Sequence, residues 1–212
     1  MANIAVIGAN GKAGSRILEE AKQRGHQVTA IVRDASKLSD KNVPIIEKDI
    51  FQLTSEDLAG FDVVVNAFAA PIGQEEQYVE AGNVLIGALQ NKPETRLFVV
   101  GGAGSLYVNE DKTLKLMDTP DFPDFVYPTA SNAGKNLEVL QGTEGLNWTY
   151  LSPSANFALG RRTGSYIHGK DHLLVNSAGE SYVSYDDFAI AVVDEIEQPK
   201  HIRERFTVAS EL

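Results

Sequence analysis

Short runs of apolar residues recur along the chain, separated by longer polar-apolar stretches. Within each run the apolar residues are continuous instead of alternating with polar ones, as is typical of strands covered on both faces of a sheet. A weaker run, VPIIEKD at 43–49, follows the second. The clear runs are IAVIG at 4–8, VTAIV at 28–32, VVVNAF at 63–68, LFVVGG at 97–102 and WTYLSP at 148–153.

Between these runs lie segments with apolar residues at helical spacing. The segment 12–24 has one apolar face and stops at Gly25, a residue suited to a helix C-terminus. Similar spacing marks 78–90 and 129–141, and Ser184 with Asp187 resembles a capping box for a last helix that ends before Pro199. The alternation predicts an α/β fold: a doubly wound parallel sheet with right-handed crossovers, in a single domain over residues 1–212.

The stretch 156–182 breaks this alternation, because it is rich in glycine and polar residues and shows no helical period. Ligands of doubly wound sheets bind at the carboxyl ends of the strands. We therefore interpret 156–182 as an irregular flap over that edge, a small C-terminal substrate part within the same domain.

Composition excludes several function classes. A net charge of −10 opposes binding to nucleic acid or to an anionic membrane. The chain has no cysteine, so disulfides, thiolate metal sites and a cysteine nucleophile are excluded. No run is long enough to span a membrane, and no basic leader precedes the first strand, so we expect a cytoplasmic protein. We also expect no metal site, because Gly169 argues against a helix that would pair His168 with His172.

Glycines at every third position follow the first apolar run, at Gly8, Gly11 and Gly14. A side chain at Gly8 would obstruct the turn, one at Gly11 would hold a phosphate away, and one at Gly14 would push the helix from the strand. A helix N-terminus with free N–H groups is a natural seat for a diphosphate. This spacing between a strand and a helix predicts a dinucleotide-binding loop.

The end of the second run indicates which dinucleotide is bound. Sites for NAD usually carry an acidic residue there, whereas this chain has Arg33, which can pair with the 2′-phosphate of NADP. Lys12 and Lys37 could add positive charge. Asp34 would restore an acid after a shift of one residue, so NADP is favoured and NAD stays possible. Asp49, after the weak third run, is expected to contact the adenine.

The strand ends that follow offer further cofactor contacts and little acid-base chemistry. The pair Tyr-x-x-x-Lys, common in hydride-transferring enzymes, is missing, since the residue four before Lys135 is Ser131. Ser105 and Tyr107 are the best candidates for catalytic contact. The expected cofactor contacts at these ends are Asn66, Ala67, Phe68, Ala69, Gly101 and Gly102.

Arg161 and Arg162 lie between glycines in the presumed flap and could hold an anionic substrate group. A solvated turn is the equal alternative. Together with Pro153 and Phe157, they are the predicted substrate contacts.

Several segments together resemble the NADH-flavin reductase group of NmrA-like atypical short-chain dehydrogenase/reductases, with flavin reductase/biliverdin-IX-beta reductase as a more distant relative. The resemblance covers essentially the whole chain. It rests on VIGANGKAGS, IVRDASKL, VVGGAGSLYV, LSPSANFALGRRTGSY, SYVSYDDFAIAVVDE and KHIRERFTV.

The resemblance implies a Rossmann domain with cofactor contacts from Gly8, Asn10, Gly11, Lys12, Gly14 and Arg33. It further implies hydride transfer to a small-molecule acceptor such as a flavin or quinone, with flavin as substrate and not as bound cofactor, by a monomer or homodimer. Such acceptors can gain their proton from water, which agrees with the missing tyrosine. The alternative is an NmrA-like redox sensor that binds NADP without turnover.

Overall fold

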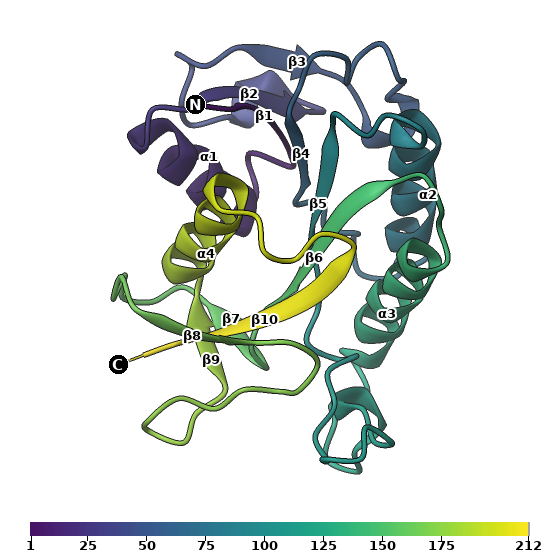
Figure 1. Ribbon diagram of the computed structural model, residues 1–212, viewed down its shortest axis with the longest axis vertical. Coiled ribbons are helices and arrows are strands. Elements are labelled where there is room, and N and C mark those ends of the chain that lie inside the picture. Colours follow the sequence, from purple (N-terminus) through teal and green to yellow (C-terminus); the bar gives the residue numbers. More distant parts are fainter. Residues whose placement is uncertain (212) are drawn as a thin grey trace.

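The computed structural model describes residues 1–211, whose strands form a sheet in the order β3-β2-β1-β4-β5-β6-β10-β8 (Figure 1). All neighbours pair in parallel except β10 and β8, which are antiparallel. The bounds are β1 Asn3–Ile7, β2 Gln27–Val32, β3 Ile45–Glu47, β4 Val63–Asn66, β5 Arg96–Val100, β6 Asn147–Ser152, β8 Tyr166–Gly169 and β10 Glu204–Ser210. The strand order reverses direction between β1 and β4, and this is where a doubly wound sheet binds its ligand.

Helices cover both faces of this sheet. Helices α1 (Lys12–Gln23) and α4 (Tyr185–Glu197) pack together on one face, and α2 (Gln77–Leu89) and α3 (Tyr127–Gln141) pack on the other (Figure 1). Alternate residues of β1 enter the two cores, with Val6 facing α1 and α4 while Ile7 faces α2 and α3. Burial on both faces explains the continuous apolar runs, and it confirms the predicted doubly wound α/β fold.

Local signals set the helix ends. The first helix ends one residue before its predicted end, and Gly25 follows with φ +82°, the left-handed conformation that favours glycine. At the start of α4 the Ser184 hydroxyl accepts a hydrogen bond from the Asp187 amide at 3.0 Å, which is the predicted cap. Short 3₁₀ turns occur at Ala35–Lys37, Ile50–Gln52 and Leu116–Asp118. No helix within residues 1–211 has the length and apolarity to cross a membrane.

The segment 156–182 is more ordered than the sequence suggested. Its start, β7 (Asn156–Ala158), pairs in parallel with β9 (Tyr182–Ser184) as a separate two-stranded sheet. Its middle, β8, is the last strand of the main sheet. The prediction of an irregular flap over the strand ends is therefore corrected, because only the beginning of the segment reaches that edge.

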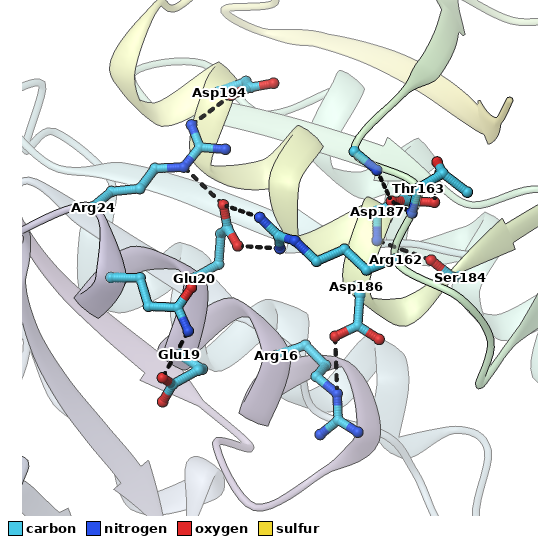
Figure 2. Close-up of polar contacts among 12 residues, drawn as sticks. Arg16, Glu19, Glu20, Arg24, Arg162, Thr163, Ser184, Asp186, Asp187 and Asp194 are labelled. Carbon is cyan, nitrogen blue, oxygen red and sulfur yellow. Dashed lines mark hydrogen bonds and ion pairs between the residues drawn. The ribbon is translucent and has the colours of Figure 1, made fainter.

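Buried carboxylates fasten this C-terminal part to the helices (Figure 2). Asp187 is fully buried and accepts hydrogen bonds from the amides of Thr163 and Gly164, each at 2.9 Å, and from the hydroxyls of Thr163 and Ser210. Glu20 of α1 lies between the guanidinium groups of Arg24 and Arg162. Residues far apart in sequence are thereby held against α1 and α4.

Replacing Asp187 by alanine should destabilise the protein by about 3 kcal/mol, because it leaves buried amide and hydroxyl groups without their acceptor. Chemical denaturation measures the loss. The control is Asp186→Ala in the same helical turn, where a partly exposed ion pair with Arg16 is lost and about 1 kcal/mol or less is expected. Equal losses in the two variants would contradict the anchoring role of Asp187.

Candidate cofactor and acceptor site

The glycine loop connects β1 to α1 at very short range. Gly8 has φ +74°, and a Cβ there would lie 2.6 Å from the Ala67 carbonyl oxygen, which follows β4. A Cβ at Gly14 would lie 2.2 Å from the Gly8 carbonyl oxygen. Only glycine fits at either position, and the helix therefore starts directly against the end of the strand.

The first turn of α1 opens toward solvent-accessible space. Gly11 is its N-cap residue in an extended conformation, and no side chain caps this turn. Lys12 and Ala13 line a cavity in front of the turn. Free amide groups and the positive end of the helix dipole suit a diphosphate at this point, so this cradle fits a dinucleotide.

One compartment of the site lies over β1 and β2 and has a cavity volume of about 410 Å³. Arg33 and Lys37 reach it with side chains that are 68% and 71% exposed. In the structure they lie 4.0 Å from Asp49 and 3.4 Å from Asp34, respectively. Asp34 also borders it, but its carboxylate accepts hydrogen bonds from the amide and hydroxyl of Ser36. Other lining residues are Gly8, Asn10, Gly11, Lys48, Ala67, Phe68 and Ala69.

A second, more apolar compartment of about 550 Å³ lies over β4, β5 and β6. It shares Gly11, Ala67, Phe68 and Ala69 with the first, so the two are parts of one groove across the strand ends. Its walls include Lys12, Gly101, Gly102, Pro153 and the aromatic residues Phe68, Tyr78, Phe122, Phe157 and Tyr185. A groove of this form can hold an extended dinucleotide beside a planar molecule.

The end of β5 is kept free of side chains by close packing. A Cβ at Gly101 would lie 2.0 Å from the Tyr150 ring, and one at Gly104 would lie 2.5 Å from the Ala130 side chain of α3. The Tyr150 hydroxyl accepts from the Gly102 amide and donates to the Ala133 carbonyl. Complete burial raises the pKa of Tyr150 to about 12.

Most of the predicted cofactor contacts border this groove, but Gly14, Asn66 and Asp49 do not. Asn66 is buried, and its Oδ1 accepts from the Phe68 amide at 3.1 Å, so it shapes the turn after β4. Asp49 caps the turn at Ile50–Gln52 and approaches Arg33 at 4.0 Å. Asn66 and Asp49 therefore support the turns that form the groove walls without lining the groove themselves. Lys48, which sequence reasoning missed, does border the groove, next to its ion pair with Asp57.

The structure does not bring the predicted catalytic residues Ser105 and Tyr107 to the groove. Ser105 is buried, and both its hydroxyl and its carbonyl oxygen accept from the Arg205 guanidinium, at 3.0 and 2.9 Å. Tyr107 contacts His172 and exchanges backbone hydrogen bonds with residues 171 and 173. Ser105 and Tyr107 therefore hold parts of the fold together away from the groove. The prediction that they make catalytic contacts in the groove is corrected accordingly.

The predicted substrate arginines are also placed elsewhere. Arg162 forms an ion pair with Glu20 on α1, so it is not free to hold a substrate anion (Figure 2). Burial alone would raise the pKa of Glu20, but hydrogen bonds from Arg162 and Arg24 outweigh it and hold that pKa below its ordinary value. Arg161 is exposed and does not border the groove. Of the predicted substrate contacts, Pro153 and Phe157 do border it.

Helix α3 presents small residues to the groove. Val126, Thr129 and Ala130 line it, whereas Lys135 is exposed, so Ser131 and Lys135 do not form a catalytic pair there. Tyr78, at the start of α2, supplies a phenol to the groove lining. No local pattern in the sequence points to Tyr78, because only the packing of α2 beside the turn after β4 brings it to the groove. Within residues 1–211, no cluster of His, Asp and Glu is arranged to hold a metal.

A doubly wound sheet with a glycine cradle at its switch point defines a dinucleotide-binding protein. The chain belongs to the NAD(P)H-binding family, whose family model matches residues 8–199.

Individual relatives extend this assignment over nearly the whole chain. An uncharacterised protein of Bacillus subtilis, YwnB, is 60% identical over 209 residues, which is 98% of each chain. A Streptococcus pneumoniae protein described as "a putative NADH-flavin reductase" is 43% identical, with a TM-score of 0.94 and 100% of both chains covered. A Lactobacillus casei protein of known structure is 34% identical, with a TM-score of 0.90 over 99% of this chain and 100% of that one.

Replacing Gly11 by alanine should weaken NADPH binding by about tenfold or more, equivalent to about 1.4 kcal/mol, because the added Cβ would lie 3.1 Å from the Gly8 carbonyl oxygen and would displace the loop that is expected to hold the diphosphate. Fluorescence titration with NADPH measures this affinity. Gly87→Ala, on an exposed part of α2 with nothing within 4 Å of the added Cβ, is the control and should leave binding unchanged. Unchanged affinity in Gly11→Ala would show that the diphosphate lies elsewhere.

Proposed function

We propose that the protein is a reductase that transfers hydride from NADPH to a planar acceptor such as a flavin or a quinone. The observation that carries this proposal is the two-part groove, with a cationic compartment at one end and a larger aromatic compartment at the other. A flavin would be a substrate here and not a resident cofactor.

The cationic compartment supports a preference for NADPH over NADH. Arg33 and Lys37 border it with exposed side chains, while the carboxylate of Asp34 is engaged by Ser36. The ribose of NADH would therefore find no free acid in the usual place, whereas a 2′-phosphate would find a guanidinium. The description of the streptococcal relative names NADH as its cofactor. In this chain, the position of Arg33 favours NADPH instead.

The aromatic compartment supports a planar acceptor. Phe157 packs against Tyr185 with ring centroids 4.4 Å apart, and Phe68 packs edge-on against Tyr78 at 6.2 Å. Flat rings of an acceptor can stack against such walls, which also exclude water from the reacting atoms. The description of the streptococcal relative as a flavin reductase agrees with this class of acceptor.

Bound NADPH supplies the hydride, and the protein's own contribution is position and exclusion of water. The glycine cradle and α1 hold the diphosphate, and Gly101 and Gly102 leave backbone without side chains beside the expected place of the nicotinamide. Pro153 and Phe157 close the opposite wall. The arrangement holds two flat molecules against each other in a mostly apolar space.

Replacing Arg33 by aspartate should reverse the cofactor preference, lowering NADPH affinity by about tenfold or more while NADH affinity rises. Paired titrations with the two dinucleotides give the ratio. Arg161→Asp makes the same change of charge on an exposed residue outside the groove, so it controls for long-range electrostatics. Equal affinities for NADPH and NADH in the unmutated protein would exclude the assignment.

The reductase itself is tested by NADPH oxidation with and without FMN, riboflavin and a simple quinone, beside matched NADH reactions. We expect turnover that depends on the acceptor and prefers NADPH. Tight NADPH binding without oxidation in the presence of any acceptor would instead indicate a redox sensor, for which the missing Tyr-x-x-x-Lys pair is the supporting observation.

A further inference from the structure

A small side cavity of about 60 Å³ opens from the aromatic compartment between α2 and α3. It shares Phe68, Tyr78, Gly101, Gly102 and Thr129 with that compartment, so the two spaces are adjoining. Its remaining walls combine the polar side chains of Asn66, Asn136 and Tyr150 with the apolar Val99 and Ala133. The proposed function gives this cavity no role.

Asn136 makes the side cavity chemically distinctive. Its side chain is 4% exposed, and its Nδ2 has no hydrogen-bond partner within the described residues. An unpartnered buried amide costs about 1–3 kcal/mol, and ordered water commonly satisfies such a group. The side cavity is large enough for water, which needs roughly 10–15 Å³ of accessible space per molecule. Asn136 Nδ2 itself faces Gly82 of α2, where an added Cβ would lie 1.7 Å from it, so water in the cavity would meet the rest of the Asn136 side chain.

Tyr78 connects this cavity to the acceptor compartment, because it borders both. The other phenols do not share this position. Tyr150 borders the side cavity, but its hydroxyl is already engaged by Gly102 and Ala133. Tyr185 borders the acceptor compartment alone.

We propose that Tyr78 is the proton donor of this site for an acceptor with a carbonyl oxygen, as in a quinone, and that water held beside Asn136 restores its proton. The inference rests on the proposed function. It adds that the acceptor is one whose reduced carbonyl oxygen must take up a proton, as in a quinone.

A quinone would take up a hydride first and a proton second. Hydride from NADPH delivers two electrons and one hydrogen, leaving a hydroquinone anion and NADP⁺. The O–H bond of Tyr78 breaks as a new O–H bond forms on the anion, which completes the hydroquinone. The Tyr78 phenolate then takes a proton from cavity water, and solvent replaces that proton, so the protein ends unchanged.

Tyr78 is protonated at neutral pH. Burial raises the pKa of its phenol, a hydrogen bond with the Ala70 backbone acts in the opposite direction, and the charge of Glu75 reinforces the rise. A raised pKa makes the phenol a weaker acid, so the donor role rests on the position of Tyr78 between the two spaces and not on its ionisation.

The test compares Tyr78→Phe with Tyr182→Phe, which removes a phenol that borders neither the acceptor compartment nor the side cavity. Single-turnover NADPH oxidation is followed with a quinone and with FMN, whose reduced form persists as an anion near neutral pH and needs no immediate proton. With the quinone, Tyr78→Phe should be slower by about a hundredfold. The FMN rate should fall far less in Tyr78→Phe, and Tyr182→Phe should keep both rates. The unmutated protein should also reduce the quinone more slowly in D₂O, a slowing that Tyr78→Phe lacks.

A second readout does not depend on activity. A high-resolution crystal structure should show ordered water in the side cavity, within hydrogen-bond distance of both the Tyr78 hydroxyl and the Asn136 side chain. A dry cavity, or equal slowing of quinone and FMN reduction in Tyr78→Phe, would overturn the inference and leave the reductase standing. If the unmutated protein reduces no acceptor, the proposed function fails and the donor role fails with it.

Discussion

The contact between Gly14 and the Gly8 carbonyl is the constraint on which the site depends. With a Cβ at Gly14 the two would be 2.2 Å apart, so the first turn of α1 lies directly against the end of β1. Gly8 is held equally close to the chain that leaves β4. These contacts bring the free amide groups of α1 to the switch point of the sheet. The turn at residues 67–69 then becomes a wall common to both compartments.

The opposite side of α1 is held as firmly. Glu20 is nearly inaccessible and is paired with Arg24 of its own helix and with Arg162 from the C-terminal part. The guanidinium groups hold the pKa of Glu20 below its ordinary value, so the pair stabilises the folded state at neutral pH and loses that contribution as pH falls through the folded-state pKa. The helix that cradles the cofactor is therefore also the one to which the C-terminal segment is tied.

The sequence predicted those parts of the molecule that are governed by local rules. Continuous apolar runs gave the inner strands, helical spacing gave all the longer helices, and the glycine pattern gave the cofactor cradle. The last strand, β10, was missed because its polar residues Thr207 and Ser210 are fully buried beside its apolar ones, against the usual pattern. Ser105 was predicted to face the ligand, but its hydroxyl accepts a hydrogen bond from the guanidinium of Arg205, 100 positions later in the chain.

The placement of Tyr78 shows why a motif is a poor guide to a phenol in this fold. In the doubly wound sheet, α2 and α3 lie side by side on one face, so a side chain from either helix can reach the end of β5. Here Gly104 and Ala130 approach so closely that an added Cβ would lie 2.5 Å away, which leaves no room for a bulky group on α3 at that point. The space that remains is bordered by α2, and Tyr78 occupies it. A sequence that lacks Tyr-x-x-x-Lys on α3 can thus still present a phenol to the groove, because the first turn of α2 borders the same space.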